Sequence, residues 1–162
     1  MPTYNTFLHE PGDPAVVGRP GALISTGAFL GVNIDVPPAI SAAITASGQA
    51  VPPSATGVAL VDTGATLTCV HEPLLKELGL NPSGTVMGGT AAGQVQQALY
   101  MVRLTFPLLG WTVDLQVVGV NLSGQSTNTE PPQPLAALLG RNLLQQCLLV
   151  WNGPGGFWTL ST

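Results

Sequence analysis

One acidic residue in this chain stands in a setting suited to chemistry. Asp62 follows the apolar run Val58-Ala59-Leu60-Val61 and begins the sequence Asp62-Thr63-Gly64-Ala65. This pattern predicts a strand that ends by presenting one carboxyl group on a glycine-containing turn. Two such groups that share one proton can activate a water molecule by acid–base chemistry. Because Asp-Thr-Gly occurs once in the 162 residues, the second carboxyl group would have to come from a second copy of the chain.

Two further segments follow this turn. Met87-Gly88-Gly89-Thr90-Ala91-Ala92-Gly93 is rich in glycine, and Leu138-Leu139-Gly140-Arg141-Asn142-Leu143-Leu144 encloses Gly-Arg-Asn between apolar residues. Together with the segment around Asp62, and in this order, they resemble the retropepsin-like aspartic proteases over roughly residues 21–151. Asp-Thr-Gly alone recurs by chance, but its combination with the third segment is specific. The chain is longer than the compact viral members and is more similar to cellular or bacterial single-domain members.

The resemblance implies a fold, an activity and a partner. The expected fold is all-β, a retropepsin-like closed β-barrel (the acid protease fold) with one or two short helices, acting as a symmetric homodimer. The expected activity is that of an aspartic endopeptidase, in which water is activated between two Asp62 carboxylates from the two subunits. It requires no metal, cofactor or covalent intermediate. Peptides or proteins would be the substrates, cut in extended and mostly apolar segments.

The resemblance also assigns roles to individual residues. Asp62, Thr63 and Gly64 would form the catalytic turn, in which Thr63 locks the two turns of the dimer together and Gly64 admits the substrate backbone. The hairpin around residues 88–93 would be a lid, or flap, whose backbone pairs with an extended substrate. The expected substrate-binding residues are Ala65, Met87, Gly88, Gly89, Thr90 and Leu138. Gly140, Arg141 and Asn142 would support the turn.

Arg141 departs from the family pattern in its expected partner. In viral relatives this arginine pairs with an acidic residue shortly after Asp-Thr-Gly-Ala, but Thr66 stands there in this chain. Arg141 therefore needs another acceptor, either a backbone carbonyl or a carboxylate such as that of Glu72.

The spacing of apolar and turn residues predicts the surrounding elements. One or two strands are expected within 23–36, and single strands over 57–61, 67–70, 98–106, 111–120, 136–139, 148–151 and 157–160. Short helices are expected over 72–79 and 141–147, and a loop with a short helix over 39–56. Residues 121–134 predict an exposed loop. Residues 1–20 are turn-rich and are interpreted as an N-terminal extension before a domain over 21–162.

Composition limits the classes of partner. Charged residues make up 7% of the chain and the net charge is −4, which argues against a nucleic-acid partner. A hydrophobic content of 45% argues against disorder. The apolar stretch 21–44 contains Asn33, Asp35 and two prolines, so no membrane partner is expected. The first residues lack the pattern of a secretory signal, and a cytoplasmic location is the resulting prediction.

Other interpretations of the same residues remain open. A dimer of this fold could hold extended peptides without cutting them, as a non-catalytic binding or dimerisation module, or the barrel could serve a structural role. Cys69 and Cys147 form no metal motif and are expected to be free thiols, with a bridge between them unsupported. His71 has no nucleophile beside it and is expected to cap a helix or lie at the surface.

Overall fold

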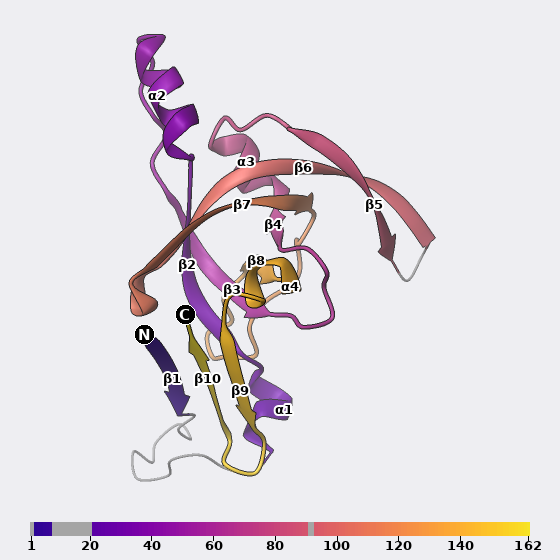
Figure 1. Ribbon diagram of the computed structural model, residues 1–162. Coiled ribbons are helices and arrows are strands. Elements are labelled where there is room, and N and C mark those ends of the chain that lie inside the picture. Colours follow the sequence, from indigo (N-terminus) through magenta and orange to yellow (C-terminus); the bar gives the residue numbers. More distant parts are fainter. Residues whose placement is uncertain (1, 8–20, 91–92) are drawn as a thin grey trace.

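The computed structural model describes residues 2–7, 21–90 and 93–162, and its largest feature is a closed β-barrel (Figure 1). Six strands follow one another in the order β2-β3-β8-β4-β7-β6, and β2 also pairs with β6, which closes the ring. These strands are β2 (Phe29–Asp35), β3 (Ala55–Val61), β8 (Leu135–Leu139), β4 (Cys69–His71), β7 (Trp111–Val120) and β6 (Gly93–Phe106). The predicted all-β fold with a closed barrel is confirmed.

The barrel is filled by alternate residues of its strands. In β6, Tyr100, Val102, Leu104 and Phe106 are buried, while the residues between them are exposed or half-buried. This period of two is what a strand with one core-facing side requires. Each large apolar side chain buried in this way contributes about 1.5–3 kcal/mol. The apolar pattern that predicted strands over 98–106 and 111–120 therefore also defines the barrel interior.

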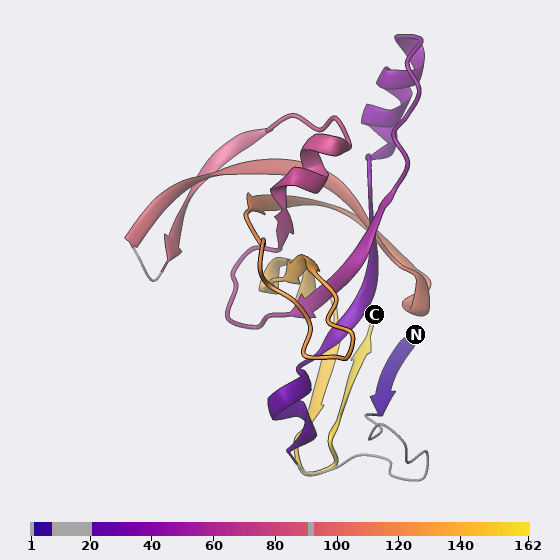
Figure 2. The ribbon, with the colours of Figure 1, turned by 180° about the vertical axis from the view of Figure 1, so that it is seen from behind.

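A hairpin projects from the barrel, as Figures 1 and 2 show. It consists of β5 (Gly84–Thr90) and the first half of β6, paired antiparallel from Gly84 with Leu99 to Thr90 with Gly93. A hairpin was expected at this glycine-rich segment, and it is present. Residues 91 and 92 of its predicted tip lie outside the described residues.

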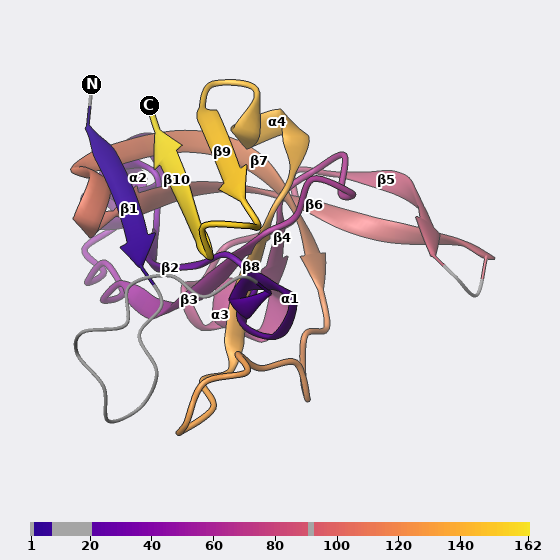
Figure 3. The ribbon, with the colours of Figure 1, turned by 90° about the horizontal axis from the view of Figure 1, so that it is seen from below.

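A second sheet joins the two ends of the chain. It contains β1 (Thr3–Phe7), β10 (Phe157–Ser161) and β9 (Leu148–Asn152), in the order β1-β10-β9. All neighbours in it are antiparallel, and Figure 3 shows the three strands side by side. The boundary expected at residue 20 stays a prediction, because residues 8–20 lie outside the described residues.

Short helices connect the strands. They are α1 (Ala22–Thr26), α2 (Pro38–Ala46), α3 (Glu72–Glu77), the 3-10 helix η1 (Pro107–Leu109) and α4 (Arg141–Leu144). The described residues thus contain more helices than the one or two expected. The helices predicted near residues 39–56 and 72–79 are present, and α2 projects away from the barrel (Figure 2). None of the helices within the described residues has the length and apolar character of a membrane-spanning segment.

Two element predictions were wrong in part. The strand expected from residue 23 begins at Phe29, because residues 22–26 form a helical turn between Gly21 and Gly27, which both adopt positive φ. Glycine adopts positive φ readily, whereas helices and strands require negative φ. The two glycines therefore end regular structure on both sides of α1. The helix expected over 141–147 ends at Leu144, since β9 begins four residues later.

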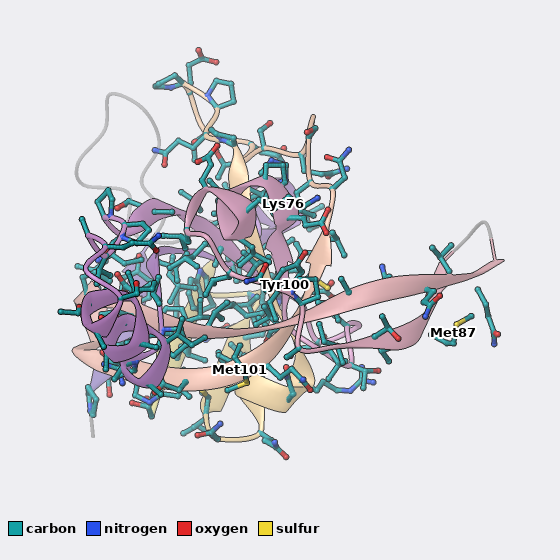
Figure 4. All side chains as sticks on the ribbon, turned by 90° about the horizontal axis from the view of Figure 1, so that it is seen from above. Lys76, Met87, Tyr100 and Met101 are labelled. Carbon is teal, nitrogen blue, oxygen red and sulfur yellow. The ribbon has the colours of Figure 1, made fainter. Side chains whose placement is uncertain are left out.

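A buried tyrosine ties α3 to the barrel. Tyr100 donates a hydrogen bond from its hydroxyl to Glu72 Oε1 at 2.8 Å, and Lys76 Nζ lies 2.9 Å from Glu72 Oε2. Figure 4 shows Tyr100 below α3 and Lys76 on that helix. Burial, followed by the hydrogen bond to Glu72, raises the pKa of Tyr100 to about 12. Tyr100 therefore remains a neutral donor throughout the range in which proteins are studied.

We expect the protein to lose stability in acid below about pH 4. Hydrogen bonds from Lys76 and Tyr100 hold the pKa of Glu72 below its usual 4.5, and the hydrogen bond from Arg103 holds the pKa of Asp114 below 3.8. A carboxyl group whose pKa is lower in the folded state stabilises the fold above its unfolded pKa. That contribution is lost as the pH falls through the folded pKa. Thermal unfolding should give a Tm that is level between about pH 7 and 5 and falls below pH 4. Glu72→Gln should make the fall shallower, and a Tm that rises on acidification would contradict the assignment.

Candidate active site

Asp62 lies in the turn that follows β3. Its backbone N–H donates to the carbonyl of Leu139 at 3.0 Å, which ties the turn to β8. Its Oδ1 accepts hydrogen bonds from the backbone N–H groups of Gly64, at 2.9 Å, and Ala65, at 3.2 Å. A Cβ at position 64 would lie 3.1 Å from that oxygen, so glycine leaves the carboxyl group its room. The turn thus holds one oxygen of Asp62 and, among the described residues, gives no hydrogen-bond donor to the other.

Arg141 supports the turn through hydrogen bonds from its guanidinium group. One of its terminal nitrogens donates to the carbonyls of Thr63, at 2.8 Å, and Gly64, at 3.0 Å, and the other donates to the Thr66 hydroxyl at 2.9 Å. The expected backbone acceptor is therefore present, whereas Glu72 is bound instead to Tyr100 and Lys76. Thr66 thus accepts a hydrogen bond from the same guanidinium that binds the two turn carbonyls.

Asn142 fixes the chain just beyond the turn. Its Oδ1 accepts from both the backbone N–H, at 2.7 Å, and the hydroxyl, at 2.8 Å, of the fully buried Thr68. The Thr68 hydroxyl oxygen in turn accepts from the backbone N–H of Gly140 at 3.1 Å. A buried network in which the groups satisfy one another holds a single geometry. Gly140, Arg141 and Asn142 thus contact the turn and the chain that follows it, and their supporting role stays a prediction.

Replacing Arg141 with methionine should loosen the turn without unfolding the protein. The substitution keeps most of the aliphatic length but removes three hydrogen bonds to Thr63, Gly64 and Thr66. Because Arg141 is exposed and water can replace it at these carbonyls, we expect a loss of about 1–2 kcal/mol in urea unfolding. Hydrogen exchange at Gly64 and Ala65 should become faster. Unchanged exchange at both amides would show that Arg141 does not hold the turn.

A cleft of about 400 Å³ separates this turn from the hairpin. One wall consists of the residues that follow Asp62 together with Val118 of β7, and the other belongs to β5 and β6. Its lining residues are Gly64, Ala65, Thr66, Leu67, Cys69, Val86, Met87, Gly88, Gly89, Gln97 and Val118. Of the predicted site residues, Gly64, Ala65, Met87, Gly88 and Gly89 therefore share one cleft. Figure 4 shows Met87 on the projecting hairpin.

Asp62 itself and the supporting residues 140–142 lie beside this cleft but do not line it, and neither do three further predicted site residues. Thr63 is exposed on the turn, and no side-chain hydrogen bond holds it within the described part of the chain. Leu138 is half-buried in β8 and pairs with Leu60 and Cys69. Thr90 ends β5, but its side chain lies outside the described residues. The expected roles of these three residues stay predictions.

Several cleft residues were not predicted from the sequence. Thr66 and Leu67 directly follow the turn, and this proximity was the available signal. Val86 and Gln97 are opposite each other in the hairpin register, while Val118 is opposite Cys69 across two parallel strands. The spacing of residues along the chain does not show such pairings. They become visible only when the strand register is known.

The cysteines and His71 are the other residues that could take part in chemistry. Cys69 and Cys147 are both free thiols, as expected. Cys69 lies in the cleft lining, where burial and then the charge of Asp62 raise its pKa, so a reactive thiolate is disfavoured at neutral pH. His71 accepts a hydrogen bond at Nδ1 from the backbone N–H of Leu122, at 3.1 Å, and anchors the loop after β7. Within the described residues, no group of three His, Cys, Asp or Glu side chains gathers as a metal site.

A protein-family model matches the part of the chain that contains this site. Residues 42–143 match the model of the aspartyl protease family, which is more than half of the chain. The chain belongs to the aspartyl protease family. The matched range includes the Asp62 turn, the glycine-rich hairpin and Arg141. The recognition of a retropepsin-like aspartic protease from three short segments is thereby confirmed.

Solved structures with a similar chain path include both viral and bacterial proteases. The simian foamy virus (mac) protease is 21% identical, with a TM-score of 0.44 over 73% of this chain and 92% of that chain. A retropepsin-like aspartic protease from Rickettsia conorii is 12% identical, with a TM-score of 0.44 over 98% of this chain and 92% of that chain. The EIAV protease complexed with an inhibitor is 18% identical, with a TM-score of 0.38 over 56% and 76%. No curated protein sequence matches this family member.

Proposed function

We propose that this protein is an aspartic endopeptidase that is active as a homodimer. The observation that carries the proposal is the Asp62 carboxyl group, held by two backbone N–H groups beside a cleft whose lining itself contains no carboxylate. Three of the other described acids are engaged elsewhere, Asp35 with Ser54, Glu72 with Tyr100, and Asp114 with Arg103, and the remaining two, Glu77 and Glu130, do not line the cleft. A second copy of the chain is therefore the available source of the second carboxyl group.

In such a dimer, the two Asp62 side chains meet on the twofold axis. Two carboxylates about 3 Å apart cannot both ionise, so the pair holds one proton between them. The ionised member takes a proton from a water molecule, and the protonated member donates to the carbonyl oxygen of the substrate. The water oxygen then bonds to the peptide carbon to give a diol. As the C–N bond breaks, the carboxyl group that took the proton from water donates it to the leaving nitrogen, and the other carboxylate takes a proton from a diol hydroxyl, which restores the shared proton. Because the pair titrates as a unit, the shared proton belongs to neither subunit alone.

The hairpin would hold the substrate over these carboxyl groups. β5 ends the strand order, so its outer edge is available to pair with an extended peptide. Gly88 and Gly89 lack side chains that would obstruct this approach, and they permit the bending that a lid requires. The cleft lining, mostly apolar, supports cleavage within apolar segments.

The exposed edge of the second sheet supports association with a second copy. β9 is an edge strand, and its Leu148, Val150 and Trp151 are 58%, 41% and 52% exposed. Proteins usually protect an edge strand with charges or prolines, and β9 carries neither. Antiparallel pairing of β9 with its symmetry mate would cover these side chains. Since β9 directly follows α4 and the Arg141 support, the same contact would bring the two turns toward one another.

The proposal is tested by peptide cleavage and by sedimentation. The protein is incubated with a mixed peptide library between pH 3 and 7, with Asp62→Asn as the inactive control, and products are detected by mass spectrometry. We expect cleavage by the parent only, and a rate that falls more steeply than the protein concentration on dilution. Retention of peptides without cleavage would identify a binding module instead.

Charge on β9 should separate the subunits. We expect Val150→Lys to shift sedimentation toward the monomer and to lower activity at least about tenfold at a fixed concentration, because a desolvated lysine opposes strand pairing. Leu108→Lys is the matched control, since Leu108 is 66% exposed on η1, away from β9. Equal sedimentation of the parent and both variants would remove β9 from the interface.

A further inference from the structure

The hairpin wall of the cleft carries one polar side chain, that of Gln97, without a hydrogen-bond partner among the described residues. Gln97 of β6 is half-buried and lines the cleft together with the apolar residues Val86 and Val118. The other polar side chains of the lining are engaged: Thr66 accepts a hydrogen bond from Arg141, and the Cys69 thiol donates to the carbonyl of Leu67. Among the described residues, none forms a hydrogen bond with the Gln97 carboxamide. A half-buried amide with no partner among the described residues can hydrogen-bond to a ligand that fills the cleft.

Gly88 creates the room for this amide. A Cβ at position 88 would overlap Gln97 Oε1 and lie 2.8 Å from its Cδ, so the Gln97 side chain lies directly over the glycine backbone. The two residues are diagonal neighbours in the hairpin, since Val86 is opposite Gln97 and Gly88 is opposite Val95. The absence of a side chain at Gly88 thus keeps the carboxamide along the cleft wall.

The neighbouring glutamine shows the contrast. Gln96 is exposed, does not line the cleft, and donates from Nε2 to the Thr85 hydroxyl across the hairpin at 3.0 Å. Gln96 carries the same carboxamide group as Gln97 and lies on the same strand, but its carboxamide has a hydrogen-bond partner within the protein. Gln96 therefore provides a matched reference for any effect attributed to Gln97.

We propose that Gln97 determines substrate specificity, by selecting peptides with an uncharged hydrogen-bonding side chain, an amide or a hydroxyl, at the subsite beside β5 and Val118. This inference rests on the proposed peptide-binding function of the cleft. A carboxamide offers both a donor and an acceptor, so it pairs with Asn, Gln, Ser or Thr in either orientation. An apolar side chain in the same place would leave the Gln97 amide dry and unpaired, which discriminates against it. The cleft lining contains no charged side chain that would favour an acid or a base.

The test compares peptide pairs that differ by Thr against Val, or Gln against Leu, at each position around the scissile bond. Cleavage by the parent, Gln97→Leu and Gln96→Leu is measured as kcat/KM. In parallel, binding of the same peptides to the Asp62→Asn protein is measured by fluorescence anisotropy, with and without each glutamine substitution. We expect one position at which the parent prefers the polar peptide about tenfold, which is about 1.4 kcal/mol. Gln97→Leu should abolish that preference, and Gln96→Leu should leave it unchanged.

Two further variants test the role of Gln97 by a change in peptide preference, which a loss of folding or of catalysis alone would not produce. Gln97→Glu retains the shape of the side chain, and it should shift the preference at the same position toward Lys or Arg. Gly88→Ala should weaken the preference although residue 97 is still glutamine, because the added methyl group displaces the Gln97 carboxamide. If the parent binds selectively but cuts nothing, the proposed protease activity fails and the inference about Gln97 stands. If the parent cuts peptides with a profile that Gln97→Leu and Gln97→Glu both leave unchanged, or if no peptide binds, the inference is overturned.

Discussion

Substitution of Asp62 by asparagine should abolish peptide hydrolysis while the protein remains folded. The carboxamide oxygen introduced at this position can still accept the hydrogen bonds from the Gly64 and Ala65 backbone, so the turn keeps its geometry. The carboxamide cannot share a proton with its counterpart or take one from water. Loss of both the general base and the general acid should lower kcat/KM by about 10⁴-fold or more. The measurement is cleavage of one good library peptide, with circular dichroism and Tm as the test of folding.

Asp35→Asn is the matched control for that experiment. Asp35 ends β2 and its carboxyl group interacts with Ser54 rather than facing the cleft. We expect Asp35→Asn to cut the same peptide within a few-fold of the parent rate. Activity that survives in Asp62→Asn and disappears in Asp35→Asn would place the chemistry elsewhere in the molecule.

Substitution of Gly140 by alanine should be the most destabilising single methyl addition near the site. A Cβ at position 140 would lie 2.7 Å from the Thr68 backbone nitrogen and even closer to the Leu67 carbonyl. These are backbone atoms that cannot rotate away, so the chain after the Asp62 turn must move. That movement would also break the buried hydrogen bond between Gly140 and the Thr68 hydroxyl. We expect a loss of about 3 kcal/mol or more in the free energy of unfolding, measured in urea.

Gly31→Ala separates the clash from the general effect of replacing glycine. Gly31 lies in β2, and a Cβ there would meet no atom within 4 Å. Since alanine loses less entropy on folding, we expect Gly31→Ala to be neutral or to stabilise by a few tenths of a kcal/mol. Equal stabilities for the two variants would show that the chain after the turn is not packed against Gly140 as described.

The sequence predicted the features that depend on local patterns of residues or on short motifs. Alternating burial in β6 follows directly from the alternation of apolar residues, and the Asp62 turn follows from its motif. The pairing of β2 with both β3 and β6, which closes the barrel, depends on contacts between distant residues and has no local signature. The helical turn at residues 22–26 was missed because its apolar residues are also typical of strands, and the two flanking glycines decide its conformation.

The same division applies to the site. The motif identified Asp62 and the segment at Arg141, but the acceptors of Arg141 are set by how the turn folds back on α4. Gln97 was not found, because its position in the cleft depends on hairpin register and on the missing side chain at Gly88. Residues whose role is marked by a sequence motif can be identified from the sequence. Residues whose role depends on their position in the folded cleft can be identified only from the structure.

Mixing wild-type protein with Asp62→Asn tests the central claim most directly. If each active site needs one Asp62 from each subunit, a chain paired with the variant is inactive. With random exchange and a roughly ninefold excess of the variant, the activity per wild-type chain should then fall to about a tenth. The same excess of Val150→Lys carrying Asp62→Asn, which should not pair, is expected to have little effect. Activity per wild-type chain that stays constant at every mixing ratio, in a sample shown to exchange subunits, would contradict a catalytic site shared between two copies.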